Sequence, residues 1–122
     1  MDELNIPATI KTPEVKLQLN GAFNFKGNSY PENATEFYEP ITNWLDSFFK
    51  VNTSNVNLTV DLKYVNTSSI KSLLNTIIKI RSSSNSTVKI AWIYEVEDDD
   101  MLATGEDLQK LAMLQFEFIE KN

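Results

Sequence analysis

The sequence predicts an α/β fold in which a mixed five-stranded sheet carries its helices mainly on one face. Five segments alternate apolar and polar residues, which is the period of a strand with one buried face. A doubly wound parallel sheet would instead bury both faces and contain continuous apolar strands. Stretches between the later strands repeat apolar residues at helical spacing. The expected order is β-β-α-β-α-β-α-β, in a single domain that covers residues 1–122.

The first two predicted strands occupy residues 15–19 and 23–25 and are joined at Asn20-Gly21, a residue pair typical of hairpin turns. A loop is predicted over residues 27–31. The next segment has an apolar stripe at helical spacing, formed by Phe37, Ile41, Trp44, Leu45 and Phe48. Pro40 lies within this predicted helix, where it either kinks the helix or marks a late helix start.

The second half of the chain contains the clearest strand, at residues 55–65. One face of this strand is formed by Val56, Leu58, Val60, Leu62 and Tyr64. A helix follows, with a buried side formed by Ile70, Leu73, Leu74, Ile77 and Ile78. The remaining predicted elements are a polar loop at 81–87, a strand at 88–96, an acidic loop at 95–100, a short helix at 105–113 and a strand at 114–118. Trp44 and Trp92 fall on the buried stripes and are predicted to be core residues.

The composition excludes several classes of function. The formal net charge is -6, which argues against nucleic acid or an anionic membrane as the main partner. The chain contains no cysteine and no histidine, so thiolate nucleophiles, imidazole relays and Cys or His metal ligands are all excluded. No signal peptide or membrane-spanning run is recognisable, and we expect a cytoplasmic location.

The acidic loop has three interpretations. It is a solvated surface run, a docking patch for a basic protein, or a carboxylate site for Mg²⁺ or Ca²⁺. Its acidic residues are Glu95, Glu97, Asp98, Asp99 and Asp100. The last three of these residues, Asp98 to Asp100, define a rival function together with Glu106, a small carboxylate-dependent, metal-assisted enzyme. The loop lacks the spacing of a calcium loop, and a helix that starts at Gly105 explains Glu106 through its dipole. We therefore predict no catalytic residue, no metal ligand and no cofactor.

The most informative segment is the junction between the strand at 55–65 and the helix that follows it. Asn66, Thr67, Ser68 and Ser69 lie here, at a predicted helix N-terminus. Thr67 or Ser68 is suited to cap the helix by accepting a hydrogen bond from a backbone N–H one turn on. A helix N-terminus also accommodates a phosphoryl group, because its negative charge meets the positive end of the helix dipole. Capping and phosphorylation are both open on these residues alone.

Several segments of the chain resemble one known family across nearly the whole sequence. Residues 27–34 and 37–40 resemble its "G-x-S-Y-P-E-N … F-Y-x-P" signature, and residues 64–71 resemble its "Y-x-N-T-S-S-x-K" segment. Residues 12–15 resemble its opening motif, and residues 92–94 with the acidic loop, Met101 and residues 105–107 resemble its C-terminal block. On these motifs the chain resembles the SiaC-type regulatory phosphoproteins.

This resemblance implies a STAS-like fold, similar to the anti-sigma factor antagonists, and a non-enzymatic role in partner switching. In such modules a serine/threonine protein kinase phosphorylates the regulator and a PP2C-type phosphatase reverses the modification. The unphosphorylated form binds a downstream target, which in some bacteria is a diguanylate cyclase. A constitutive interaction module without phosphorylation is the alternative.

The same resemblance assigns candidate site residues. The phosphorylated threonine of the family corresponds to Thr67, and the modified serine of the wider antagonist group corresponds to Ser68. Residues beside the phosphorylation site become candidates for the partner surface, and the loop at 29–33 is a candidate neighbour of that surface. The predicted partner-binding residues are Asn66, Ser69, Lys71, Tyr30, Glu32 and Asn33.

Overall fold

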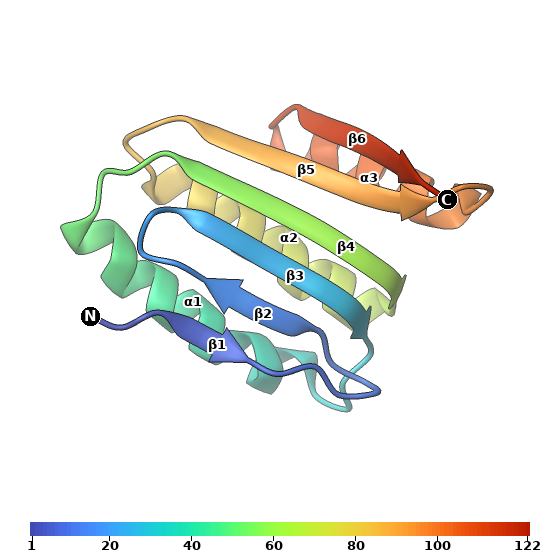
Figure 1. Ribbon diagram of the computed structural model, residues 1–122, viewed down its shortest axis with the longest axis horizontal. Helices are drawn as coiled ribbons and strands as arrows, with labels where there is room; N and C mark the ends of the chain where they lie inside the picture. The colour runs from blue at the N-terminus through green and yellow to red at the C-terminus, as the bar shows by residue number, and fades with distance from the viewer.

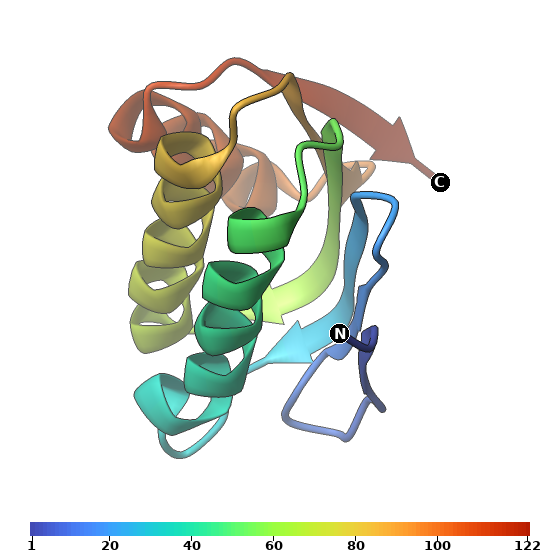
Figure 2. The ribbon, with the colours of Figure 1, turned by 90° about the vertical axis from the view of Figure 1, so that its left-hand side faces the viewer.

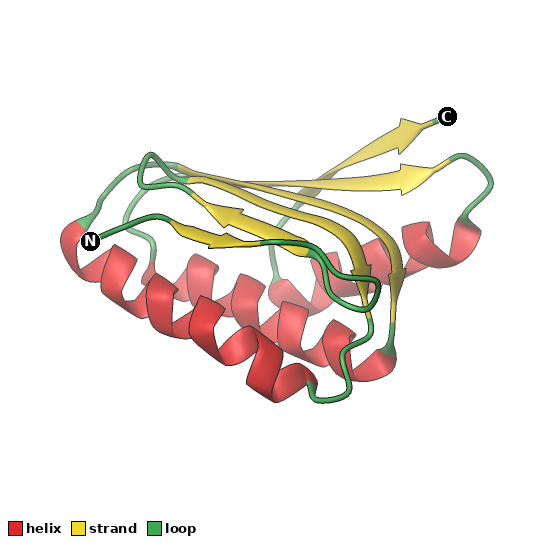
Figure 3. Ribbon diagram, turned by 60° about the horizontal axis from the view of Figure 1, so that its bottom comes forward, coloured by secondary structure: helices red, strands yellow, loops and turns green.

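Three helices cover one face of a curved six-stranded sheet in the computed structural model, which describes residues 1–122 (Figures 1 and 3). The strands are β1 (Leu4–Ile6), β2 (Glu14–Leu17), β3 (Ala22–Ser29), β4 (Val56–Val65), β5 (Val88–Glu95) and β6 (Phe116–Lys121). The helices are α1 (Ala34–Val51), α2 (Thr67–Ser83) and α3 (Asp99–Ala112). The length and hydropathy of the three helices do not meet the requirements of a membrane-spanning segment.

The strands lie in the sheet in the same order as in the chain. β1, β2 and β3 pair antiparallel, whereas β3, β4, β5 and β6 pair parallel, with one helix crossing over between each parallel pair. This arrangement confirms the predicted α/β class, the mixed sheet and the location of the helices on one face. The other face of the sheet has no helix against it (Figure 3).

The sheet has six strands and not the predicted five, because the sequence interpretation missed β1. This strand has only three residues, and Leu4 and Ile6 alone are too short a pattern to show alternation. It forms because the edge of β2 offers backbone partners, with Leu4 opposite Leu17 and Ile6 opposite Val15. Pairing with a strand elsewhere in the chain, and not local preference, decides its conformation.

The predicted hairpin turn at Asn20-Gly21 is confirmed. Gly21 has φ +91°, a conformation that side chains with a Cβ rarely adopt. A Cβ at this position would also lie 1.9 Å from the carbonyl oxygen of Asn55. The turn therefore requires glycine both for its backbone conformation and because the backbone of Asn55, just before β4, passes so close to it.

The core lies between the sheet and the three helices (Figure 2). Trp92 in β5 is fully buried, as predicted, and its Nε1 donates a hydrogen bond to the carbonyl oxygen of Met101. Trp44 in α1 is half-buried, stacks on Phe48, and donates from Nε1 to the carbonyl oxygen of Asp2. The indole of Trp44 thus anchors the N-terminal segment as well as packing against the core.

The predicted starts of two helices are corrected by the structure. α1 begins at Ala34 and continues through Pro40, so the late-start alternative is wrong. α3 begins at Asp99, with Asp98 as its N-cap, so Gly105 lies within the helix and does not begin it. Gly105 is required by packing instead, because a Cβ there would lie 2.5 Å from the indole of Trp92. Gly105, which the sequence predicted to begin the helix, is instead the position where α3 packs closely against Trp92 of β5.

Candidate functional site

The N-terminal ends of the three helices gather along one edge of the sheet, where β3, β4 and β5 end (Figure 1). Each helix is capped there by a side chain that accepts a backbone N–H: Asn33 for α1, Asn66 for α2 and Asp98 for α3. The positive ends of three helix dipoles therefore lie at the same edge. Thr67, the first residue of α2, is part of this edge.

The cap of α2 is Asn66, and not Thr67 or Ser68 as the sequence suggested. The side-chain oxygen of Asn66 accepts a hydrogen bond from the Ser69 N–H at 2.9 Å. The same oxygen accepts a weaker hydrogen bond from the Ser68 hydroxyl at 3.3 Å. The Thr67 hydroxyl takes no part in these bonds, and both Thr67 and Ser68 are exposed. Helix capping is thus provided without Thr67, the predicted phosphorylation site.

Ser69 has a different place from its neighbours. Its side chain is 0% exposed, and its hydroxyl accepts a hydrogen bond from Ser29 at 2.9 Å. Ser29, also buried, is 2.8 Å from the hydroxyl of Tyr38 in α1. Burial raises the pKa of Tyr38 to about 12, although the hydrogen bond to Ser29 acts in the opposite direction. The prediction that the Ser69 side chain contacts a partner is therefore wrong; it joins β3, α1 and α2 beneath the surface.

The loop at 29–33 does lie beside the junction, as the sequence analysis proposed. Ser29 is paired with Val65, and the Asn66 N–H donates to the Ser29 carbonyl oxygen at 3.0 Å. A hollow of about 490 Å³ lies between the first turns of α1 and α2. Its lining includes the predicted partner-binding residues Glu32, Asn33 and Lys71, together with Ser68. The hollow thus brings together four predicted positions from two distant segments, Glu32 and Asn33 from one and Ser68 and Lys71 from the other. Asn66, a fifth predicted position, caps α2 beside them.

An irregularity in β4 adds a residue that the sequence analysis did not identify. Gly27 is paired with Leu62, but the next residue, Asn28, is paired with Tyr64, so Lys63 is an extra residue in β4. This β-bulge reverses the alternation that follows it. Leu62 is buried, whereas Tyr64 is 54% exposed, and the predicted inward orientation of Tyr64 is wrong.

Tyr64 packs edge-to-face against Tyr30, with ring centroids 5.5 Å apart. Tyr64 is three residues before Thr67, so this aromatic pair borders the junction. Exposed tyrosines are frequent anchors of protein interfaces. The only sequence signal for Tyr64 was its place in the family-like segment at 64–71, because its position in the alternating pattern predicted burial.

The acidic residues do not form the metal site considered from the sequence. Asp98 caps α3 by accepting the Met101 N–H at 3.0 Å, while Asp99 and Asp100 occupy the first turn of α3. No group of three acidic side chains in the molecule is arranged to hold a metal ion. Asp99 and Asp100 instead complement the positive end of the α3 dipole.

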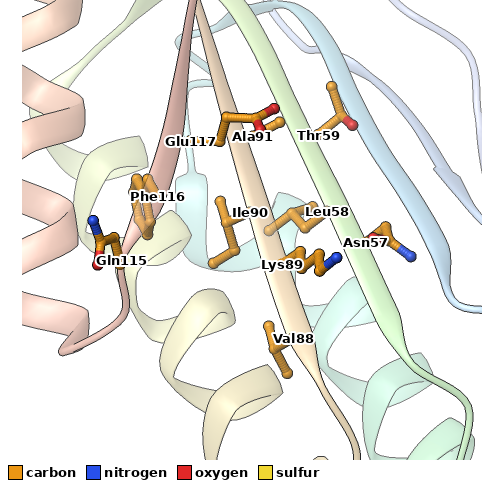
Figure 4. A pocket seen from close by; sticks show the side chains of 10 residues that line it. All are labelled: Asn57, Leu58, Thr59, Val88, Lys89, Ile90, Ala91, Gln115, Phe116 and Glu117. Carbon is orange, nitrogen blue, oxygen red and sulfur yellow. The ribbon is translucent and has the colours of Figure 1, made fainter.

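A second hollow has a volume of about 360 Å³, and Figure 4 shows the side chains that line it. It is lined near the start of β5 and β6, and Figure 4 shows Lys89 of β5 and Glu117 of β6 among its residues. The junction lies at the opposite end of the parallel strands. This hollow therefore contributes nothing to the candidate site.

Comparison with known proteins gives a consistent result. Residues 6–121 match the model of the "SiaC family regulatory phosphoprotein". The chain is 26% identical over 119 residues to an uncharacterised protein of Pseudomonas aeruginosa (strain UCBPP-PA14), covering 95% of this chain and 94% of the relative. Apo-SiaC from Pseudomonas aeruginosa is similar in structure, with a TM-score of 0.84, 26% identity and full coverage of both chains.

A second solved structure shows a relative bound to another protein. It is the complex of the diguanylate cyclase SiaD with its activator SiaC from Pseudomonas aeruginosa. The similarity to this structure has a TM-score of 0.88 and 25% identity, over 97% of this chain and 99% of the matched chain. Because the family model spans nearly the whole sequence and the solved structures share the fold, this chain belongs to the SiaC family of regulatory phosphoproteins.

Proposed function

We propose that this chain is a non-enzymatic partner-switching regulator whose target is a diguanylate cyclase. In this proposal the unphosphorylated protein binds the cyclase, and phosphorylation of Thr67 releases it. A serine/threonine protein kinase adds the phosphoryl group and a PP2C-type phosphatase removes it. The family assignment and the SiaD–SiaC complex of the Pseudomonas relative support the class of target.

The single observation that carries the phosphorylation proposal is the division of roles at the start of α2. Asn66 caps the helix, Ser69 is buried, and Thr67 remains exposed outside these hydrogen bonds. A phosphoryl group on Thr67 adds nearly two negative charges next to the positive end of the helix dipole. The fold can therefore accept the modification, while a partner that covers the junction meets a large change in charge. Ser68, also exposed, is the second candidate.

The proposed partner surface consists of the residues that surround Thr67. Lys71 and Glu32 line the hollow between α1 and α2, and Asn33 and Asn66 cap the two helices. Tyr30 belongs to the same surface through its contact with Tyr64. A target that spans these two helix ends would lie directly over Thr67.

The switch is tested by measuring cyclase affinity for three forms of the protein: wild type, Thr67→Ala and Thr67→Asp. Isothermal titration should show that Thr67→Asp weakens binding by about tenfold or more, because the carboxylate places negative charge inside the interface. Thr67→Ala should bind like wild type. Thermal unfolding of Thr67→Asp should stay close to that of wild type, because the helix dipole accommodates the charge.

Thr53→Asp is the matched control for the added charge. Thr53 is exposed in the connection between α1 and β4, at the opposite end of the sheet from Thr67 (Figure 1). Its substitution should leave cyclase affinity unchanged. Equal affinities for wild type, Thr67→Ala and Thr67→Asp would refute the switch.

The choice between Thr67 and Ser68 is made by intact mass after incubation with the kinase and ATP. We expect wild type and Ser68→Ala to gain one phosphoryl group, and Thr67→Ala to gain none. Loss of the modification in Ser68→Ala but not in Thr67→Ala would move the site to Ser68. No added mass in any form would favour a constitutive interaction module.

A further inference from the structure

A third hollow lies near the junction, on the face of the sheet that carries no helix. It has a volume of about 390 Å³ and contains three lysines, Lys26 of β3, Lys63 of β4 and Lys121 of β6. The whole chain has only eleven lysine and arginine residues against seventeen acidic ones, so three cations in one hollow are a marked concentration. We call these three residues, with the hollow they line, the lysine patch.

Two of these lysines, Lys26 and Lys63, form no salt bridge, although Lys26 lies opposite Glu14 of β2 and Asp61 of β4 in the sheet register. The hollow also contains Asp61 and Glu14, but Asp61 is paired with Lys121 at 2.5 Å and Glu14 with Lys16 at 3.9 Å. Neither Lys26 nor Lys63 forms a salt bridge within the chain. Three lysines and two carboxylates leave the hollow with a net charge of +1, although the molecule is acidic overall.

The β-bulge joins this patch to the aromatic pair at the junction. In a regular strand, two consecutive side chains point to opposite faces. Because Lys63 is the extra residue, Lys63 and Tyr64 are both exposed. Asn28, which lines the hollow, is paired with Tyr64. The sheet register therefore places Tyr64 next to a residue that lines the lysine patch.

We infer that this surface docks an acidic segment of the protein that the chain regulates, with carboxylates on Lys26 and Lys63 and an apolar side chain against Tyr64. The inference rests on the proposed function, because it names the chemistry of the same partner. An extended peptide suits the surface better than a free anion does. Charged and aromatic groups lie side by side here, and no unsatisfied buried polar atom faces an enclosed ion site.

The position of the patch also explains how phosphorylation would release the partner. Lys63 precedes Asn66 by three residues, or about 10 Å of strand. A standard protein interface covers about 800 Å² on each partner, so one footprint includes both the patch and Thr67. A phosphate on Thr67 would add negative charge at the edge of a surface that binds an acidic segment. Repulsion of that segment opposes binding directly.

The test uses the full chain and a fluorescein-labelled peptide of ten glutamates as probe, followed by fluorescence anisotropy at low salt. The double variant Lys26→Gln/Lys63→Gln should bind the peptide about tenfold more weakly than wild type, since it removes two of the three positive charges of the patch. The control, Lys50→Gln/Lys110→Gln, removes two exposed lysines from α1 and α3 and should bind like wild type.

A variant that is expected to tighten peptide binding distinguishes a loss of charge from general damage to the fold. Asp61→Asn keeps the shape of the residue but frees Lys121, so it should tighten peptide binding by about threefold. No measurable binding by wild type would overturn the inference. Equal loss in the two lysine double variants, or weaker binding by Asp61→Asn, would overturn it as well.

The patch and the switch can fail separately. The cyclase itself is titrated against the Lys26→Gln/Lys63→Gln variant and against Thr67→Asp. Both should bind it more weakly, and the affinity of wild type should fall as salt is raised. Unchanged cyclase affinity in the lysine double variant would refute the patch even if Thr67→Asp weakens binding. Unchanged affinity in Thr67→Asp alone would refute the switch and leave the patch in place.

Discussion

At the scale of single residues, four consecutive polar side chains at the start of α2 have separate tasks. Asn66 satisfies a backbone donor, Thr67 and Ser68 face solvent, and Ser69 joins two other elements through Ser29. The sequence shows four similar side chains, any of which can cap a helix. Geometry alone assigns the cap to Asn66 and thereby leaves the Thr67 hydroxyl available for the proposed phosphorylation.

This assignment makes a prediction for stability. Asn66→Ala should lower the free energy of unfolding by about 1 kcal/mol, because the Ser69 N–H loses its acceptor. Thr67→Ala should change it by less than about 0.5 kcal/mol, as is usual for exposed residues. Urea unfolding followed by circular dichroism measures both. A larger loss for Thr67→Ala than for Asn66→Ala would show that the cap has been assigned to the wrong residue.

At the scale of elements, α3 shows how packing against the sheet decides what a residue does. Gly105 resembled a helix start in the sequence but lies within α3, against the indole of Trp92. That indole cannot move aside easily, because it is fully buried and its Nε1 is bonded to the Met101 carbonyl. The β-bulge at Lys63 is a second case, since its effect on Tyr64 depends on how β4 pairs with β3.

Substitution of Gly105 tests this packing. Alanine is favoured over glycine within a helix by about 1 kcal/mol, but overpacking a core costs about 1–3 kcal/mol. With a Cβ placed 2.5 Å from the indole, we expect the clash to dominate and Gly105→Ala to be destabilising. Its free energy of unfolding is compared with that of Ala103→Gly, an exposed site on α3 where glycine should be the less stable residue. A more stable Gly105→Ala protein would show that the indole can shift.

At the scale of the whole molecule, a buried chain of hydroxyls connects the sheet to two helices. Ser69 of α2, Ser29 of β3 and Tyr38 of α1 form this chain, and no buried side-chain polar atom is left without a partner. Buried polar groups are tolerated only when they are hydrogen-bonded in this way. The three linked hydroxyls therefore fix the position of α1 relative to α2. The hollow beside Ser68 and Lys71 depends on that relative position.

The pKa of Tyr38 gives a prediction for alkaline pH. Its pKa is about 12 in the folded protein and 10.0 without the protein environment, so the folded state favours the neutral phenol. The resulting stability is complete below pH 10 and is lost as pH rises through 12. Between pH 9 and pH 11 the ionisation of Tyr38 should therefore lower the free energy of unfolding by about 1 kcal/mol. Urea midpoints of wild type and Tyr38→Phe at both pH values measure the difference, and an equal pH dependence of the two proteins would contradict the prediction.

The sequence by itself determined the α/β class, the one-sided packing of the helices, the hairpin at Gly21 and the family motifs around Thr67. Each of these follows from the periodicity or identity of residues that are close in the chain. Only the tertiary structure decided that Leu4–Ile6 is a strand, that Ser69 is buried and that Tyr64 faces solvent. The physical reason is that these outcomes depend on partners nine or more residues away, in β2, β3 and α1, whose positions no local pattern encodes.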